Sequence, residues 1–466
     1  MRGRVHGSLL VTALSRLSGL DSVQFALERA RAAGAHSVDA VLAESDALEV
    51  RVRGKEVDTV TQSRERTLGI RVFADGPGGL RSAVTSSSDL SRDAVARLAE
   101  DTVALARATA PDPSAGLPAG GFARELPDLA LFDPADRSLT PADWIALAQR
   151  AEDAARGADP RITNSEGSSA STSRTSVCYG SSAGFSGAYE CASHSLYAQP
   201  VAAQNGAMQT SWWASASRTV AGLDSPEEVG RVAAQRTVAQ LGATRAPTCE
   251  VPVIFDSSAA RDLLGNVVGC LSGYSVYRGS SFLRGRTGQP IASERVTIVD
   301  DGRKRGGLGS KPFDGEGQPT RRNVLVEHGV LRSWLLDSYS ARKLGLATTG
   351  NAARHAGGAP SASPTNLWLE PGSGDLESLV RGLDRGLLVT GMLGMGFNPV
   401  TGDFSRGAHG FWIERGERIH PVQEITIAGN LGAMLTDIEA LGADLHFLGA
   451  MGAPSLRVAR MTLAGA

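Results

Sequence analysis

Side chains that could do chemistry are most concentrated in residues 391–430, where glycine-rich turns alternate with aromatic and β-branched runs. Such a pattern predicts a β-hairpin with polar groups gathered at one end. Asp403, His409, Glu414 and Glu424 could supply metal ligands or acid–base groups there. The same spacing also suits turn and rim residues of a sheet, and from spacing alone this second interpretation is the stronger one.

A metal site of the zincin type needs two histidines one helical turn apart with a glutamate between them. The sequence has no His-Glu-x-x-His, and its nearest approach is Glu190 with His194. Both lie in a β-like segment, where their spacing also places them on one face. Because a pair is not a site, His194 is better explained as a hydrogen-bonded sheet histidine. His355 stands in a glycine-rich segment and could meet a substrate.

Nucleophilic and phosphate-binding motifs are incomplete. There is no Gly-x-Ser-x-Gly elbow between a strand and a helix. Ser338 follows a predicted strand and an acidic residue, but no histidine partner is evident. Residues 302–309 are glycine-rich without the Walker pattern. Taken alone, these residues predict a polar cleft without a complete catalytic set.

Composition limits the classes of partner. The chain has 466 residues, a formal net charge of −2, 42% hydrophobic and 21% charged residues. Its length predicts two domains. The near-neutral charge argues against nucleic acid or an anionic membrane as main partner, because both attract a strong basic excess. The apolar run within residues 1–20 is interrupted by Ser15 and Arg16, which predicts an extension or a first helix, and no later run reaches membrane-span length.

The cysteines are Cys178, Cys191, Cys249 and Cys270, and they form neither a CxxC pair nor a metal-knuckle spacing. We therefore expect buried, reduced thiols of a cytoplasmic protein. Pairing of Cys178 with Cys191 across a hairpin is the less favoured alternative.

The elements that must position these side chains follow from apolar spacing and turn residues. Helices are expected at 22–33, 93–108, 142–156, 226–242, 257–271, 375–385 and 430–441. Strands are expected at 37–42, 47–52, 57–62, 67–73 and 80–85, in an antiparallel meander over 161–218, and then at 251–255, 296–299, 322–326, 330–336, 387–393 and 455–463. The predicted organisation is an extension at 1–20, an α/β domain at 21–245 and a β-rich domain at 246–466.

Several longer segments carry a family resemblance. They are 276–283 (VYRGSSFL), 311–317 (KPFDGEG), 334–345 (WLLDSYSARKLG) and most of 396–430, with 111–113, 161–167 and 194–196 in the first half. Together they resemble the TldD/PmbA family of metalloproteases, in its TldE (PmbA) branch. The resemblance implies an α+β fold with an N-terminal α/β domain, an antiparallel sheet with flanking helices, and a β-rich, barrel-like C-terminal domain.

The resemblance also concerns the metal site. In the TldD subunit, the helix after the first strand of the C-terminal domain carries His-Glu-x-x-x-His, and a cysteine near the C-terminus completes the site. The matching segments here are 264–269 (LGNVVG) and 447–452 (FLGAMG), which lack these ligands. The resemblance thus implies a non-catalytic chain without metal or cofactor, with zinc in a TldD-type partner. Cys270 follows the lost second histidine and is expected to be a core thiol, although a replacement ligand is conceivable.

The main hypothesis is a TldE-type subunit that joins a TldD-type subunit in degrading or maturing unfolded or modified peptides, with no nucleic-acid or membrane partner. A homodimer is possible when the chain is alone. Candidate substrate-cavity residues are Tyr274, Arg278, Asp337, Tyr339, His355, Asn398, Asp403 and Arg406. Internal salt bridges of Arg278, Asp337 and Arg406 are an equally weighted alternative. The other hypotheses are a stand-alone metal-dependent peptidase with a rebuilt site (Asp403, His409, Glu414 or Glu424) and a non-enzymatic, peptide-binding homo-oligomer.

Overall fold

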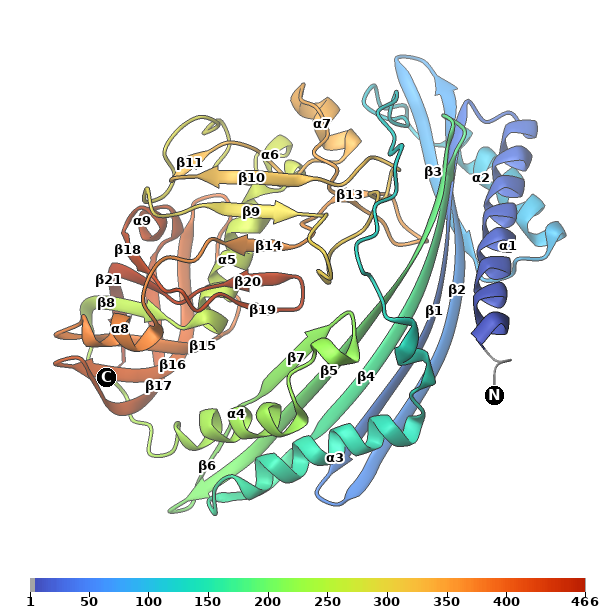
Figure 1. Cartoon of the computed structure of the whole chain (residues 1–466). Helices are drawn as coiled ribbons and strands as arrows, with labels where there is room; N and C mark the ends of the chain where they lie inside the picture. The colour runs from blue at the N-terminus through green and yellow to red at the C-terminus, as the bar shows by residue number, and fades with distance from the viewer. Residues whose placement is uncertain (1–4, 466) are drawn as a thin grey trace.

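The computed structural model of the chain describes residues 5–465. Figure 1 shows a long curved sheet with helices against it, beside a second body that holds a small barrel and another sheet. We call residues up to 245 the N-terminal part and residues from 246 onward the C-terminal part, after the predicted boundary. The predicted α+β class with a C-terminal barrel is confirmed. Among residues 5–465, no helix is both long and apolar enough to cross a membrane.

The N-terminal part is built on one antiparallel sheet with the strand order β3-β2-β1-β4-β5-β6, in which β7 also pairs with β5. Gly54, with a φ of 63°, closes the hairpin between the long strands β1 and β2. The elements in chain order are α1 (Val5–Ala32), β1 (Ser37–Arg53), β2 (Glu56–Gly76), β3 (Gly79–Ser87), α2 (Arg92–Ala108), α3 (Pro141–Gly157), β4 (Ile162–Ser181), β5 (Phe185–Gln204), β6 (Ala207–Thr210), β7 (Trp213–Ser217) and α4 (Pro226–Val238).

Residue alternation along β1 decides what covers each face of this sheet. Val38 and Ala40 pack with α1 and α2, while Val50 belongs to the cluster formed with α3 and α4. The intervening positions point the other way, and Val41 packs against Phe313 of the C-terminal part. The sheet is therefore buried on both faces along much of its length, by helices on one side and the C-terminal part on the other.

Two expectations for the N-terminal part were wrong in extent. The helix predicted from residue 22 begins at Val5, so Asp21 lies inside α1 and does not cap it. The alternative that the N-terminus forms a first helix is confirmed for residues 5–20. Residues 1–4 lie outside the described range. The four short strands predicted over 37–73 are two continuous ones, β1 and β2. Pairing of β1 with β4 holds the polar middle of β1 in the sheet, and no local pattern encodes that pairing.

The C-terminal part contains a closed barrel and a second sheet. Strands β17, β16, β15, β8 and β21 are neighbours in that order, and pairing of β17 with β21 closes the ring. The second sheet has the order β11-β10-β9-β14-β20-β19. The elements are β8 (Cys249–Phe255), α5 (Ser257–Leu271), α6 (Gly273–Tyr277), β9 (Ile298–Asp301), β10 (Arg322–Glu327), β11 (Val330–Leu331), α7 (Ser338–Leu344), β12 (Ala352–Ala353), β13 (Ser361–Ala362), β14 (Leu367–Leu369), α8 (Leu376–Arg381), β15 (Arg385–Leu393), β16 (Asp403–Glu414), β17 (Glu417–Asn430), α9 (Leu431–Thr436), β18 (Ile438–Leu441), β19 (His446–Leu448), β20 (Met451–Ala453) and β21 (Leu456–Ala464).

Helix α5 lies between the barrel and the second sheet, and all three contribute to one core (Figure 1). Its apolar residues Leu263, Leu264, Val267 and Val268 are buried in that core. This spacing is that of one helix face. The opposite face of α5 is thereby turned away from the core.

Three predicted elements of the C-terminal part were too long. The helix expected over 430–441 ends at Thr436, because residues Ile438–Leu441 pair with β21 as strand β18. The strand expected over 330–336 is the two-residue β11. The helix expected over 375–385 ends at Arg381, before β15 begins.

A buried charge network joins the two parts. Asp39 of β1 accepts hydrogen bonds from Arg71 of β2 (Nη2 to Oδ2, 2.6 Å) and from Arg354 of the C-terminal part (Nη1 to Oδ1, 2.7 Å). Arg71 also lies 3.3 Å from Glu316, and Tyr179 donates to Asp39 at 3.1 Å. The side chains of Asp39 and Arg354 are 0% and 1% exposed. The network fixes how the sheet meets the C-terminal part, and with it the pockets along this boundary.

Candidate functional site

The first candidate site, which we call the tyrosine pocket, has a volume of about 430 Å³ and lies between the sheet of the N-terminal part and helices α6 and α7. It is lined by Arg71, Phe73, Ser82, Val84, Asp112, Ala115, Gly116, Tyr274, Tyr277, Asp337, Tyr339, Ser340, Arg342 and residues 359–362. Three of the predicted cavity residues, Tyr274, Asp337 and Tyr339, thus come together in one pocket.

Aromatic rings form one wall of the tyrosine pocket. The centroids of Tyr274 and Tyr277 are 5.4 Å apart, and those of Tyr277 and Tyr339 are 5.9 Å apart. Arg278 places its guanidinium 5.1 Å from the Tyr274 ring centroid and donates to the Tyr274 hydroxyl at 2.5 Å. Tyr339 donates to Asp112 at 2.6 Å, so the wall continues into the N-terminal part.

Asp337 has a structural task as well. It is the N-cap of α7, and its Oδ1 accepts from the backbone N–H of Ser340 at 2.8 Å, in a reciprocal capping box. Burial raises the pKa of this carboxyl. The hydrogen bonds with Ser340 satisfy this buried carboxyl. Asp337 thereby begins α7, the helix that carries Tyr339 into the pocket wall.

The second candidate site, the α5 pocket, has a volume of about 560 Å³. Its walls come from the outer face of α5, from β16 and from the segment between β19 and β20. The lining residues are Arg261, Asp262, Gly265, Asn266, Pro364, Thr365, Leu367, Arg406, Leu448, Ala450 and Met451. The two segments that match the metal-site segments of the TldD subunit therefore do meet around one cavity.

The donors of the α5 pocket do not fit zinc. A protein zinc site needs at least three Cys, His or carboxylate ligands. Only Asp262 among the lining residues is of these types, and it accepts a hydrogen bond from Arg261 at 2.8 Å. In the described range, no three His, Cys, Asp or Glu side chains form a group that could hold a metal ion.

Cys270 directly follows the segment 264–269. Leu264 of this segment is buried and only 4% exposed, whereas Gly265 and Asn266 line the pocket. The buried thiol of Cys270 lies 3.9 Å from the Pro399 carbonyl, and burial raises its pKa to about 11. Such a thiol is a core group, as expected.

The four residues of the hypothetical rebuilt metal site lie apart. Asp403 and Glu414 are the first and last residues of β16, on the order of 30 Å apart along the strand. His409 lies between them against Gly391, and its burial lowers its pKa. Glu424 pairs with Arg245 at 2.7 Å. This arrangement offers no common coordination sphere, so the rebuilt-site hypothesis is wrong for these residues.

The remaining predicted cavity residues are dispersed. Asn398 accepts from the Val400 N–H, and Asp403 accepts from the Thr401 hydroxyl at 2.6 Å, so both brace the β15–β16 turn. His355 is exposed on the loop before β13. Arg406 lines the α5 pocket. Within residues 5–465 none of Arg278, Asp337 and Arg406 makes a salt bridge within 4.0 Å, so the internal salt-bridge alternative does not account for them.

Glu190 and His194 share the buried face of β5 but have separate partners. Glu190 pairs with Arg137 at 2.7 Å. His194 lies 3.3 Å from Asp136 and stacks on Trp144, with ring centroids 5.4 Å apart. His194 is thus a structural residue of the sheet, but the predicted hydrogen bond is wrong, because neither ring nitrogen has a hydrogen-bond partner among the described residues and the ring is held by stacking beside the Asp136 carboxylate. None of the four cysteines, all in the described range, forms a disulfide, so the Cys178–Cys191 pairing was wrong. Cys178 and Cys270 are buried, and the other two are half-buried.

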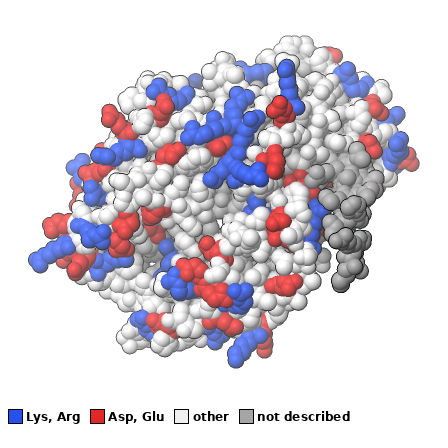
Figure 2. Space-filling view, viewed as in Figure 1, with Lys and Arg blue, Asp and Glu red and all other residues white. Residues whose placement is uncertain are grey.

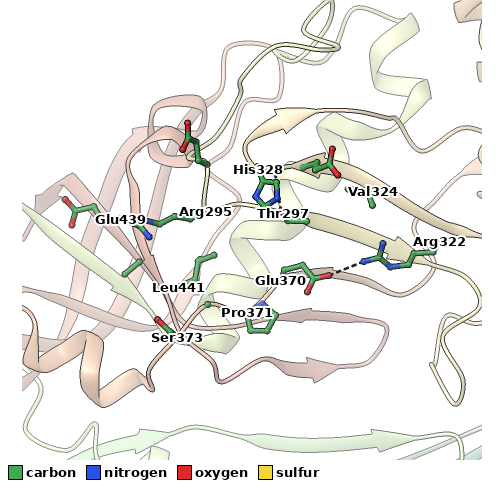
Figure 3. Close-up of a pocket in the computed structure, with 14 residues that line it drawn as sticks. Arg295, Thr297, Arg322, Val324, His328, Glu370, Pro371, Ser373, Glu439 and Leu441 are labelled. Atoms are coloured by element: carbon green, nitrogen blue, oxygen red, sulfur yellow. Dashed lines mark hydrogen bonds and ion pairs between the residues drawn. The ribbon is translucent and has the colours of Figure 1, made fainter.

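A third pocket, of about 630 Å³, opens near β9, β10 and β18 (Figure 3). Three of the four glutamates that line it pair with arginines: Glu370 with Arg322 at 3.2 Å, Glu327 with Arg332 at 3.1 Å and Glu439 with Arg457 at 3.1 Å. Figure 2 shows mixed charge over this face of the molecule, with one group of basic side chains near its centre. These surfaces are balanced by their own counter-charges and offer less specific chemistry than the first two pockets.

Sequence reasoning missed the pocket walls contributed by distant segments. Phe73 and Asp112 line the tyrosine pocket from β2 and from the loop after α2. Asn266 and Thr365 line the α5 pocket from opposite sides of the core. No local signal marks them, because each becomes a lining residue only through packing of elements far apart in the chain.

Comparison with known families gives three consecutive matches. Models of the PmbA/TldA metallopeptidase match residues 38–106 (domain 1), 134–241 (central domain) and 248–465 (C-terminal domain). The "Metalloprotease PmbA" of Escherichia coli O157:H7 is 38% identical over 447 residues, covering 96% of each chain. A PmbA homolog of Haemophilus influenzae is 36% identical over 447 residues, covering 95% of each. A TldD homolog of Buchnera aphidicola is 28% identical over 242 residues, or 48% of this chain and 50% of that protein.

Solved structures agree with the fold. A crystal structure from Bacteroides thetaiotaomicron, described as that of a proposed modulator of DNA gyrase, has a TM-score of 0.88 at 27% identity and covers 96% of this chain and 98% of that one. TldE from Thermococcus kodakarensis has a TM-score of 0.86 at 24% identity, covering 95% and 100%. The long sheet and the barrel are thus shared across both chains.

Proposed function

Because the chain belongs to the PmbA/TldA metallopeptidase family, we propose that it is the TldE-type subunit of a heteromeric peptidase. A TldD-type partner holds the catalytic zinc in this proposal. The present chain helps to enclose an unfolded or modified peptide and does not break its bonds.

The α5 pocket is the observation that carries the proposal. It lies between α5 and the β19–β20 segment, and glycine, asparagine, leucine, alanine and methionine line it there. None of these side chains activates water or binds zinc as a thiolate, imidazole or carboxylate does. A chain of this kind needs a partner to supply the hydrolytic chemistry.

The remaining architecture suits a role in holding peptide. Strand β19 ends its sheet and pairs only with β20 there, and an edge strand is where an extended peptide can add by main-chain hydrogen bonds. The tyrosine pocket offers aromatic surface beside polar groups, which suits varied side chains. In the proposal, these features hold extended substrate while the partner cleaves it.

The test combines metal analysis with reconstituted proteolysis. The purified chain, a TldD-type subunit from the same organism and their mixture are each assayed for bound zinc and for cleavage of an unstructured peptide. We expect zinc and cleavage to require the TldD-type subunit, and full cleavage to require both chains. A TldD-type subunit whose metal-helix glutamate is replaced provides the inactive control.

The other hypotheses give different results. One zinc held tightly by the isolated chain, with peptide hydrolysis, would show a stand-alone peptidase. A self-complex that binds peptide and ignores the TldD-type subunit would show a non-enzymatic homo-oligomer. Either outcome would overturn the proposal.

A further inference from the structure

We infer that the α5 pocket is a binding site for a carboxylate group of a polypeptide, held by Arg406 with Asn266 beside it. Arg406 comes from barrel strand β16 and Asn266 from α5, and both line the cavity. This inference rests on the proposed peptide-holding role and names the chemical group that the pocket recognises.

Arg406 is placed as a binding residue would be. It lies between Phe404 and Ala408 on the inward face of β16, and these two neighbours are each only 2% exposed. Its aliphatic stem is therefore held against the core, and its guanidinium reaches the pocket. Its Nε is buried without a hydrogen-bond acceptor in the structure. Buried donors are nearly always paired, and an acceptor held in the pocket, water or ligand, could pair this one.

Asn266 provides a second donor of the same kind. Its Nδ2 is also buried and has no hydrogen-bond partner in the structure. A guanidinium and an amide N–H beside each other match the two oxygens of a carboxylate. The two residues belong to separate elements, which makes their convergence on one cavity a property of the packed fold.

The space for a ligand comes from the glycines of α5. A Cβ added at Gly265 or Gly269 would meet nothing within 4 Å. The helix backbone is therefore open to the cavity at Gly265, and a polypeptide main chain can approach it closely.

The net charge of the residues that line the α5 pocket favours a ligand group with a single negative charge. Arg261 and Asp262 compensate each other at 2.8 Å, which leaves Arg406 as the one uncompensated charge among the lining residues. A monoanionic carboxylate matches this balance, whereas a phosphate dianion would face the Asp262 carboxylate with excess charge.

The pocket wall is partly apolar. Leu367, Leu448 and Met451 all line the cavity, and the last two are half-buried. Apolar side chains on the same cavity wall as a binding cation suit the apolar residues that flank a carboxylate in a peptide. This favours a carboxylate carried on a polypeptide over a free organic acid.

The binding test uses three versions of one fluorescein-labelled, unstructured Ala/Ser/Leu peptide. The first has a free C-terminal carboxylate, the second a C-terminal amide, and the third the amide with one internal glutamate. We expect anisotropy titrations with the full chain to give the first or the third peptide a dissociation constant about tenfold lower than that of the second, or lower still. Preference for the first identifies the chain terminus as the source, and preference for the third identifies an acidic side chain.

Two variants test the pocket independently. Arg406→Gln removes the cation, and Gly265→Leu fills the cavity at a position where a side chain has room. Both are expected to abolish the difference between acid and amide peptides. Arg460→Gln, whose parent side chain is 71% exposed, serves as the matched control and should keep it.

The inference is overturned if the wild-type chain binds no peptide, if it binds all three peptides alike, or if the difference survives in both pocket variants. None of these results bears on proteolysis by the assembled complex, which tests the proposed function separately.

Discussion

The strongest prediction concerns Asp39, whose carboxylate joins the two parts of the chain. Replacement by asparagine keeps the shape of the side chain and removes its charge. Arg71 and Arg354, with side chains 8% and 1% exposed, then lose their shared counter-ion in the interior. Breaking a buried ion pair by removing one partner costs about 3–5 kcal/mol, because the remaining charge stays buried.

Three features place Asp39→Asn within that range. Two cations lose their anion, which increases the cost. Glu316 remains 3.3 Å from Arg71, which limits it. The amide oxygen can still accept one hydrogen bond, which limits it further. We therefore expect a loss of about 4 kcal/mol in the free energy of unfolding, or roughly 1 M in urea midpoint at a slope of about 3–4 kcal/mol per M.

Urea unfolding followed by circular dichroism and tryptophan fluorescence measures this loss. Asp46→Asn is the matched control, because Asp46 pairs with Arg64 at 3.5 Å with both side chains mostly exposed, and such pairs contribute only about 0–1 kcal/mol. If Asp39→Asn loses no more unfolding free energy than the control does, the conclusion that this network holds the two parts of the chain together is refuted.

The pH dependence has a definite sign. Burial alone raises the pKa of the Asp39 carboxyl, but Arg354 and Arg71 outweigh it and hold the pKa below its ordinary value. A carboxyl of this kind stabilises the fold above its unfolded pKa of about 3.9, and this contribution is lost as pH falls through the folded pKa. The stability difference between wild type and Asp39→Asn should therefore be constant near neutral pH and shrink below about pH 4.

Three further predictions concern packing, capping and thiol reactivity. Gly69→Ala would place a Cβ 1.5 Å from the Ala356 carbonyl oxygen, and the backbone shift should lower stability by about 1–3 kcal/mol or more in urea unfolding. Asp337→Ala removes the N-cap of α7 and should cost about 1 kcal/mol, whereas Asp337→Asn should cost less. At pH 8, iodoacetamide should modify half-buried Cys249 in the native chain but Cys270 only after unfolding, because burial raises the pKa of Cys270 to about 11; mass spectrometry of timed samples reads this out.

Helices were the more predictable elements because their signals are local. The expected helix at 93–108 is α2, one residue longer, and that at 257–271 is α5 with Asp256 as its N-cap. Long strands were less predictable. The exposed, polar stretch at 56–66 continues β2 only because β1 pairs along its whole length. That pairing is a tertiary contact, and strand propensity in a polar, exposed sequence does not reveal it.

The candidate site was only partly predictable from the sequence, because packing of distant segments decides which polar residues share a pocket. Tyr339 belongs to a segment that carries the family resemblance, and it lines one pocket with Tyr274. Asn398 and Asp403 belong to another such segment, yet they brace a turn on another part of the barrel. Polar residues beside glycine are common both in turns and in binding loops, and only the packed structure separates the two.

The position of the α5 pocket follows from the buried face of the helix. Leu263 and Val267 anchor α5 in the core, so positions 265 and 269 must point outward whatever residues occupy them. Glycine there weakens the helix, and a Cβ would meet no atom within 4 Å. Gly265→Ala and Gly269→Ala should therefore each stabilise the chain by about 0.5–1 kcal/mol, measured by urea unfolding. If either destabilises it, the outer face of α5 is packed and not open, and the argument that these glycines leave room for a ligand fails.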